Sequence, residues 1–591
     1  MADEETAEAG TIPPPADASA EQPNRSALIK QAIFVFLVAC VCGAWLQINP
    51  GFMPYGQGEN ETVWSWQRNE GALRGDTPYH IKFAYLLRTG AIGDAGEDFH
   101  WTRLSIWNGS FSDKDFLYHV YLTPFTLGAE DEFHWQSLIN GAKFATIIAW
   151  GLFGLCLFAG LRMLGVRRAW LATLAGGALM GSLMAYRMSE PRSWLFGVCM
   201  AILGWGALSR GSRKTVFVVA VLYVLSYTGC HLLLVMALFR LTFRQLWQPV
   251  GSTRRKTLIE DLQLSGLVLA GLIIGWLLHP GSFALLKIWW VQNVLVPWGH
   301  SGGGVIGSIS ASLLGWPEGA QMATVPPDMS GVEMLPYGFG KLSTGASFML
   351  AAPLLLPLAS LALKHKPSAT TFATCVIAVG FIVLTFRNGR FLEYAVPFTL
   401  LASMSWLGEL TATEKLRSSL AKVPPRKLLA TACASLGLLL GINLYVAGND
   451  IGYLPRAYYE EAGVWMQDHN EMKGKVVWNH GWDSFPELFM FRSDCDYIWG
   501  MDPMFTAALA NEDGQRVIEF MDGRLDHWGG DPRVAFYIMR EQYGVDYVFF
   551  RDDMKDRMML RQVDSWADAG LLERKYYDEQ HGFALYELPK N

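Results

Sequence analysis

The first residues able to do chemistry stand in the stretch RGDTPYHIKFAYLLRTG, residues 74–90. It brings a carboxylate, Asp76, close to Tyr79 and His80. Such groups can accept or donate protons when they lie within hydrogen-bond reach of a substrate. A simpler interpretation is that Asp76 only caps a helix with Pro78 in its first turn. Tyr79 and His80 would then anchor that helix at a membrane surface. The residues alone leave both interpretations open.

A second cluster, AYRMSEPRSW, packs Arg187, Glu190 and Arg192 into a turn between two apolar segments. The cluster is a candidate part of a binding site, since ionisable residues gather here at the edge of the membrane segments. The alternative is structural, because ion pairs between the arginines and Glu190 would tie the turn together.

A third cluster, LTFRNGRFLEYAVPF, carries Arg387 and Arg390 around an Asn-Gly turn. The planar guanidinium fork matches a phosphate, so two arginines near a bilayer surface suit a lipid-linked phosphate. The structural alternative is pairing with Glu393, which follows directly.

Three weaker motifs are also present. Asp113 and Asp115 form a D-x-D pair that can chelate a metal, although Asp113 can equally cap the next helix. His231 stands in the bend SYTGCH and is a candidate contact for a sugar or a phosphate, or a boundary histidine with a structural partner. The long loop 279–345 spells G-x-G-x-x-G without a preceding strand, so it indicates a mobile lid and no nucleotide-binding fold.

The elements that carry these clusters are apolar runs. The 591 residues are 51% hydrophobic and 17% charged, with a mean hydropathy of +0.19. Runs of about 17–25 apolar residues are long enough to cross a bilayer. We expect a mainly α, polytopic transmembrane bundle of about eleven spans. The expected spans are 28–46, 138–161, 169–186, 193–209, 215–227, 231–241, 262–279, 346–363, 369–386, 393–409 and 428–446.

Basic residues fix the expected sidedness. Lys and Arg cluster in the short loops after alternate spans, which the positive-inside rule places in the cytoplasm. A helical hairpin turning at Gly229 keeps the basic ends of 215–227 and 231–241 on the same side. Residues 1–27, acidic and Pro-rich, predict a disordered cytoplasmic tail. The net charge of −6 argues against a nucleic-acid partner.

This topology predicts three parts. Residues 28–446 form the membrane domain, with outer loops 47–137 and 279–345, and residues 447–591 form an extracytoplasmic α/β domain. KVVWN, CDYIWG, DYVFFRD and FALYELP are its expected strands. Its aromatic stretches suit docking onto the membrane domain, or sugar rings. Almost no ionisable residue sits at mid-span, which favours chemistry at the outer boundary over transport.

The order and sidedness of these motifs resemble the GT-C superfamily of membrane glycosyltransferases. That group includes protein O-mannosyltransferases, aminoarabinose transferases and oligosaccharyltransferase catalytic subunits. The resemblance lies in GDTPYH of the first outer loop, the exit of the third span, the short hairpin, the long late loop and the outer domain. It covers most of the chain.

The resemblance implies a donor sugar on a polyprenyl phosphate or pyrophosphate, transferred at the outer face to a lipid, glycan or protein acceptor. Asp76 would be the base or a metal ligand. Glu190 matches a metal-binding position of oligosaccharyltransferase-like relatives, but the acidic pair of those relatives is missing here. A divalent metal (Mg²⁺ or Mn²⁺) on Asp76 and Glu190 therefore stays open. The residues expected to line the cleft are Tyr79, His80, Glu190, Arg192 and His231, with Arg387 and Arg390 on the donor phosphate.

The resemblance also implies an integral protein of a bacterial inner membrane. Two alternatives share the lipid contacts: a transporter or flippase of lipid-linked saccharides, and a non-catalytic assembly factor for envelope glycans. Neither needs a base at Asp76.

Overall fold

The structure is a computed structural model. It describes residues 25–48, 51–56, 62–67, 75–93, 99–247, 252–298, 304–317, 320–326, 335–422, 424–452, 459–551, 557–578 and 582–589. The predicted tail lies almost entirely outside these residues.

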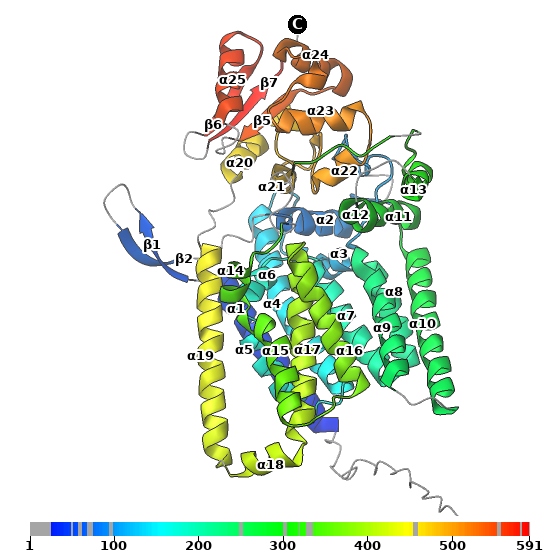
Figure 1. Cartoon of the computed structure of the whole chain (residues 1–591). Coiled ribbons are helices and arrows are strands. Elements are labelled where there is room, and N and C mark those ends of the chain that lie inside the picture. Colours follow the sequence, from blue (N-terminus) through cyan, green and yellow to red (C-terminus); the bar gives the residue numbers. More distant parts are fainter. Residues whose placement is uncertain are drawn as a thin grey trace, which may run out of the picture.

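Long helices run side by side in a bundle, and every expected span coincides with one or two of them (Figure 1). Five helices of the described residues are long and apolar enough to cross a membrane, or up to seven if each bent pair counts as one span. The expected count of about eleven is therefore not confirmed, because several bundle helices are shorter. The bundle helices are α1 (Arg25–Ile48), α4 (Trp135–Met163), α5 (Ala169–Leu179), α6 (Ser182–Ser189), α7 (Trp194–Arg210), α8 (Arg213–Ser226), α9 (Leu232–Trp247), α10 (Ser252–Leu278), α15 (Ser347–Ala362), α16 (Ala369–Thr385), α17 (Leu392–Thr411) and α19 (Pro425–Gly452).

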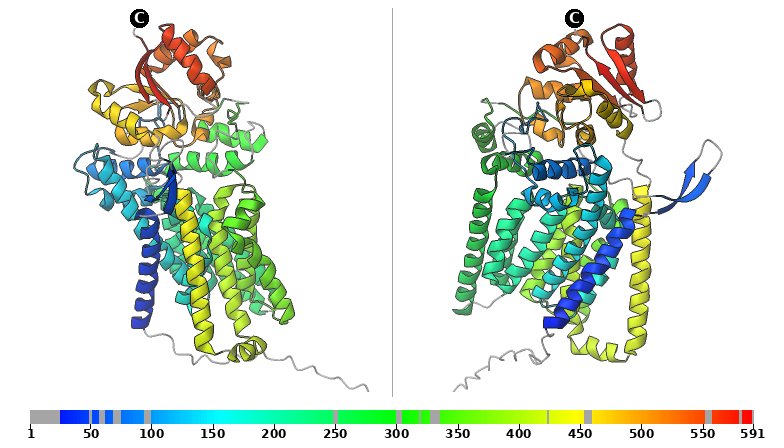
Figure 2. Two further views of the ribbon diagram at one scale, coloured as in Figure 1. Left: turned by 90° about the vertical axis from the view of Figure 1, so that its left-hand side faces the viewer. Right: turned by 180° about the vertical axis from the view of Figure 1, so that it is seen from behind.

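The two ends of the bundle differ (Figures 1 and 2). One end carries the C-terminal domain and is called the outer end. The other carries the short helix α18 (Glu414–Ala421) and is called the inner end. The hairpin expected around Gly229 is present: α8 ends at Ser226, a 3-10 turn follows, and α9 returns to the inner end.

The span expected at 169–186 is not one straight helix. It bends by 94° between α5 and α6, and a second bend of 87° separates α14 (Phe339–Gly345) from α15. The bends touch each other at two glycines. Gly181 has a φ of +84°, and a Cβ there would lie 2.1 Å from the carbonyl oxygen of Gly345. Only glycine fits such a contact in that conformation, and hydropathy alone does not reveal it.

Helix α2 (Thr77–Thr89) lies across the outer end, roughly perpendicular to the bundle (Figure 1). The amphipathic spacing of apolar residues in this segment predicts a helix that rests on the membrane surface. Residues 77–86 are instead all buried, because α2 packs between the bundle and the helix α21 (Phe485–Phe491). Its polar face meets protein and not water. Helix α2 packs on α3 (Phe116–Leu122) and η2 (Thr123–Thr126). The outer end also carries α11 (Ser282–Trp290), η4 (Val291–Leu295), α12 (Val296–Trp298) and α13 (Gly304–Leu314). The first loop also holds the antiparallel strands β1 (Gly51–Gly56) and β2 (Thr62–Gln67).

The C-terminal domain is built on a five-stranded sheet in the order β4-β3-β5-β7-β6. Strand β3 pairs in parallel with β4 and β5, and β7 is antiparallel to β5 and β6. Four strands fall where the sequence predicts them; β6 does not, because the charged stretch ERKYYD lacks an apolar alternation. The strands are β3 (Val476–Asn479), β4 (Asp496–Tyr497), β5 (Tyr547–Arg551), β6 (Glu573–Asp578) and β7 (Phe583–Glu587). The helices are α20 (Glu460–Asp468), α21, α22 (Pro503–Ala507), α23 (Glu512–Met521), α24 (Pro532–Tyr543) and α25 (Arg557–Asp568).

The first outer loop holds the domain on the bundle. The backbone N–H of Arg103 donates to the carbonyl of Tyr497 at 2.9 Å, and its guanidinium forms an ion pair with Asp496 at 2.7 Å. The indole of Trp101 donates to the carbonyl of Ser493 at 2.5 Å. The ring of Trp101 also packs on Phe489 of α21, with centroids 5.1 Å apart, so the aromatic stretch of α21 serves docking, as one of the two interpretations predicts.

Candidate active site

Asp76 is the residue immediately before α2, but it does not cap that helix. Its side chain accepts no hydrogen bond from the first turn. The carboxylate instead forms an ion pair with Arg192 at 3.5 Å. Gly75 permits this approach: it has a φ of +59°, and a Cβ there would lie 2.7 Å from Nη2 of Arg192. The capping interpretation is wrong for this carboxylate, because its charge faces a guanidinium.

A chain of ion pairs leads from Asp76 into the bundle. Arg192 also contacts Glu190 at 3.7 Å. Arg187 donates to Glu190 and to Glu393, each at 2.5 Å. The turn after α6 is thus tied both to α2 and to the beginning of α17, which supports the structural role expected for these arginines. The guanidiniums of Arg187 and Arg192 and the carboxylates of Glu393 and Asp76 are all largely buried, so their ion pairs hold the turn in one geometry.

Lys114 brings a further cation to the same region. Its ammonium group donates to Asp115 at 2.9 Å and is mostly buried. Burial alone would lower the pKa of Lys114, but the carboxylates of Asp115 and Asp76 raise it above its ordinary value. Burial would raise the pKa of Asp115, yet the charges of Lys114, His80 and His119 lower it to about 2. Lys114 is therefore a fixed positive charge whose field reaches Asp76.

Arg390 faces the outer domain. Burial raises the pKa of Asp502, the N-cap of α22, and the positive charge of Arg390 opposes that rise. The charge of Lys114 also lowers the pKa of Asp502, whereas the charge of Asp76 raises it. Arg390, Lys114 and Asp76 therefore all act electrostatically on Asp502. Arg387 lies apart, exposed, with its guanidinium 3.4 Å from the carbonyl of Pro297.

Tyr79 and His80 point into the core. They are 2% and 3% exposed. The Tyr79 ring lies against Phe485 and Phe489 of α21, with centroids 6.2 and 6.0 Å apart. His80 forms a hydrogen bond of 2.8 Å with His119.

The histidine pair continues into the D-x-D segment. His119 forms a hydrogen bond of 2.7 Å with Asp113, which also accepts from the backbone N–H of Asp115. Burial and the neighbouring His119 hold the pKa of His80 well below its ordinary range. The hydrogen-bonded chain of His80, His119 and Asp113 is thus buried and holds α2 in place. His231 lies at the hairpin bend, where it accepts from the indole of Trp289 at 3.3 Å.

The residues proposed as metal ligands do not fit a divalent ion. Asp76 and Glu190 share the guanidinium of Arg192, so a positive charge already stands between the two carboxylates. Across the described parts of the chain, no group of three His, Cys, Asp or Glu side chains could hold a metal. We derive no step through a metal.

Sequence reasoning missed two members of this site. Lys114 stands between the two aspartates of the D-x-D motif, and that motif by itself indicates metal chelation. Asp502 follows an aromatic stretch that indicates docking or sugar binding, and Arg390, whose charge acts on it, comes from another domain. The signal available for Lys114 was a lysine flanked by acids on the outer side, where the positive-inside rule disfavours basic residues.

No protein-family model matches this chain, and no curated protein matches it in sequence. Solved structures do. One is the oligosaccharyltransferase AglB from Archaeoglobus fulgidus in complex with an inhibitory peptide and a dolichol-phosphate, 13% identical, matched over 95% of this chain and 74% of that one, with a TM-score of 0.55. Another is ArnT from Cupriavidus metallidurans bound to undecaprenyl phosphate, 12% identical, matched over 95% and 98%, with a TM-score of 0.52.

The archaeal enzyme also matches in its complex with Zn and sulfate, at 13% identity over 94% of this chain and 74% of that one, with a TM-score of 0.50. At such identities the comparison shows a shared fold. It is the fold of the archaeal oligosaccharyltransferase and of ArnT, and the resemblance seen in the sequence is confirmed as a likeness of fold. Together with its long apolar helices, it identifies the chain as an integral membrane protein.

Proposed function

We propose that this protein is a membrane glycosyltransferase that moves a sugar from a polyprenyl phosphate or pyrophosphate to a lipid, glycan or protein acceptor at the outer membrane face. The observation that carries this proposal is the carboxylate of Asp76, which makes no side-chain cap and lies close to two cationic side chains, Arg192 and Lys114, at the outer end of the bundle. The shared fold with two proteins solved with polyprenyl phosphates supports the donor class.

The proposed reaction is a displacement at the anomeric carbon. The acceptor oxygen forms a bond to that carbon, its proton passes to the Asp76 carboxylate, and the bond to the donor phosphate breaks. Arg192 orients the carboxylate through their ion pair at 3.5 Å.

The departing phosphate gains negative charge, and Lys114 and Arg390 are the groups proposed to stabilise it. Arg390 binds the phosphate in this proposal. Arg387 has a lesser part, because it is exposed and already contacts the carbonyl of Pro297. Glu190, Tyr79 and His80 act through position: they hold Arg192 and α2 in place. His231 is proposed to line the donor path beside Trp289.

The test uses the purified full-length protein and labelled polyprenyl-phosphate sugars. Asp76→Asn is expected to lower the transfer rate by about 10²–10⁴-fold while donor binding persists. Asp526→Asn removes a carboxylate that is 72% exposed in the outer domain and serves as the control. Full transfer activity of Asp76→Asn would refute the role of Asp76, and donor flipping in its place would favour the flippase.

A second pair of variants tests the phosphate contacts. Arg390→Gln should weaken donor binding about tenfold, as expected for the loss of a charged contact to phosphate. Arg387→Gln should weaken it less. Unchanged donor affinity in both variants would contradict the proposed phosphate site.

A further inference from the structure

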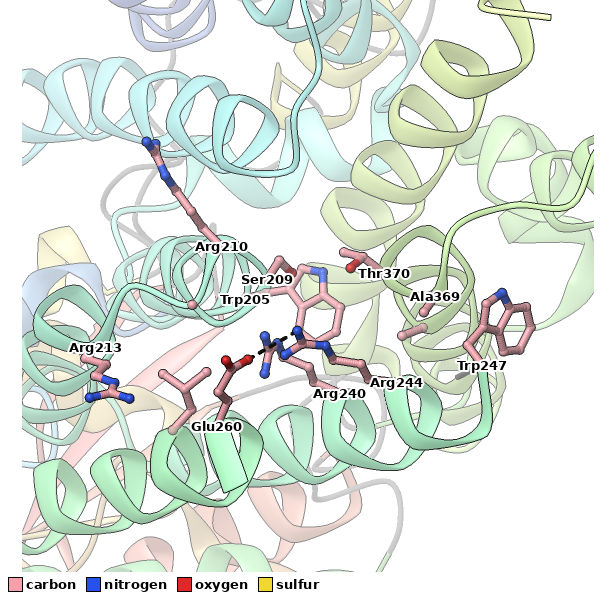
Figure 3. Close-up of a pocket in the computed structure, with 13 residues that line it drawn as sticks. Trp205, Ser209, Arg210, Arg213, Arg240, Arg244, Trp247, Glu260, Ala369 and Thr370 are labelled. Carbon is pink, nitrogen blue, oxygen red and sulfur yellow. Dashed lines mark hydrogen bonds and ion pairs between the residues drawn. The ribbon is translucent and has the colours of Figure 1, made fainter. Parts of the chain in front are cut away.

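A second site lies at the inner end of the bundle, remote from Asp76. A cavity of about 550 Å³ opens there between the ends of α7, α8, α9, α10 and α16 (Figure 3). Its lining includes four arginines and two tryptophans: Arg210, Arg213, Arg240, Arg244, Trp205 and Trp247. A volume of several hundred Å³ is the size of ordinary ligand sites.

The charge of the cavity is positive. Asp261 pairs with Arg240 and, at 3.1 Å, with Arg244, while Glu260 contacts Arg244 at 3.3 Å. Arg213 donates to the neutral amide of Gln263 at 2.5 Å. In the part of the chain that the structure describes, two carboxylates thus face four guanidinium groups. The excess positive charge favours an anionic ligand.

One uncommitted polar group lines the same space. The hydroxyl oxygen of Ser209 is buried and has no hydrogen-bond partner among the described residues. The first turn of α16 also lines the cavity, with Ala369 and Thr370, but its N-terminus already has partners. The N–H of Thr371 donates to the Ser368 hydroxyl, and the N–H of Ser368 donates to the Glu409 carboxylate at 3.0 Å. A hydroxyl without a partner beside several guanidinium forks provides donors that bind phosphate.

The surroundings favour a lipid as the bearer of the phosphate. The indoles of Trp205 and Trp247 bind the protein at their nitrogen ends, at 3.0 Å to Thr374 and 3.2 Å to Pro367, so their rings form walls. Trp247 packs on Phe372 of α16, with centroids 4.6 Å apart. Phe372 in turn lines an apolar groove of about 220 Å³ between α15, α16 and α17. A polar cavity next to an apolar groove suits a headgroup with its acyl chain.

We propose that this cavity, the inner arginine site, binds the phosphate of an anionic lipid headgroup from the membrane leaflet at the inner end. The proposal does not depend on the transferase activity, because the site is at the opposite end of the bundle. Basic residues that only set the topology need no cavity and no buried hydroxyl without a partner beside them. These two features distinguish the inner arginine site from such residues.

The test measures lipid binding to the full-length protein in detergent by native mass spectrometry. Phosphatidylglycerol is the anionic probe and phosphatidylcholine the zwitterionic one. Arg213→Gln with Arg244→Gln should weaken phosphatidylglycerol binding about tenfold or more, at roughly 1 kcal/mol for each basic residue near the headgroup. Binding of phosphatidylcholine should not change.

The control is Arg255→Gln with Lys256→Gln, which removes the same charge from exposed positions of α10 outside the cavity. Equal weakening in both double variants would overturn the proposal. Replacing Arg244 takes one partner from the buried carboxylate of Asp261. A second variant, Arg210→Gln with Arg213→Gln, changes only arginines at the exposed rim and should fold. If this rim variant binds phosphatidylglycerol as the wild type does, the proposal also fails. Millimolar inorganic phosphate that displaces the lipid would show a free-phosphate site and overturn the lipid source, whereas a lack of displacement supports it.

Discussion

The contact between Gly75 and Arg192 makes a sharp prediction about the substitution Gly75→Ala. A Cβ at this position would lie 2.7 Å from Nη2 of Arg192, whereas ordinary contact begins near 3.4 Å. The guanidinium must therefore move by roughly 0.7 Å, which it can do because it is the end of a flexible side chain. The contact with Asp76, now 3.5 Å, is lost or distorted.

The expected loss of transfer rate is about 10- to 100-fold, since a misplacement of about 1 Å at a reacting group can cost 10²-fold. The left-handed backbone adds a stability cost of about 1–2 kcal/mol for any residue with a Cβ. The rate is measured in single turnover with labelled donor, and stability by the thermal midpoint in detergent.

Gly90→Ala is the matched control at the other end of the same helix. Gly90 has a φ of +71°, and a Cβ there meets nothing within 4 Å. The two variants should lose similar stability, but only Gly75→Ala should lose activity. On an Arg192→Ala background, Gly75→Ala should cause no further loss of rate. Equal activity of the two glycine variants would refute the reasoning, and so would a further loss on the Arg192→Ala background.

Two other predictions concern protonation and metals. Burial lowers the pKa of Lys82 to about 8, although Glu132 opposes this, so the unfolded chain binds more protons than the folded one between about pH 8 and 10.5. The destabilising effect of Lys82 should fade as pH rises through that window. The thermal midpoint of the wild type, measured relative to that of Lys82→Met, should therefore rise between pH 7.5 and 9.5. A difference that stays constant over this range would contradict the prediction. Treatment with EDTA should leave the transfer rate unchanged, because Arg192 already stands between Asp76 and Glu190; a loss restored by Mg²⁺ or Mn²⁺ would show that the arginine gives way to a metal.

Local patterns predict the membrane helices well, because burial in a bilayer demands long apolar runs whatever their partners. The hairpin at Gly229 follows from the basic residues on both of its flanks. The bends at Gly181 and Gly345 do not follow, since they arise from one backbone passing within contact distance of another. A pattern within one segment holds no information on such a contact.

The sequence likewise predicts some residues of the candidate site and not their partners. Asp76 and the arginine clusters can be recognised as unusual residues at the outer boundary. Their partners cannot be found locally: Asp76 pairs with Arg192 from a different loop, and the charge of Arg390 acts on Asp502 of another domain. The amphipathic pattern of residues 77–89 correctly predicts a helix, but it places that helix on the membrane surface, because the pattern does not distinguish a lipid surface from the protein surface of α21.

The packing of α21 on α2 also bears on how the protein is made. Tyr79 leaves the ribosome roughly 400 residues before Phe485, which is tens of seconds at ordinary rates of translation. During that interval the nascent α2 lacks its protein cover, and the bilayer surface can shelter its apolar side. The region around Asp76 becomes complete only when the last-made domain has folded against α2. Ribosome-bound chains stopped before Phe485 should therefore leave α2 open to protease, and finished chains should protect it.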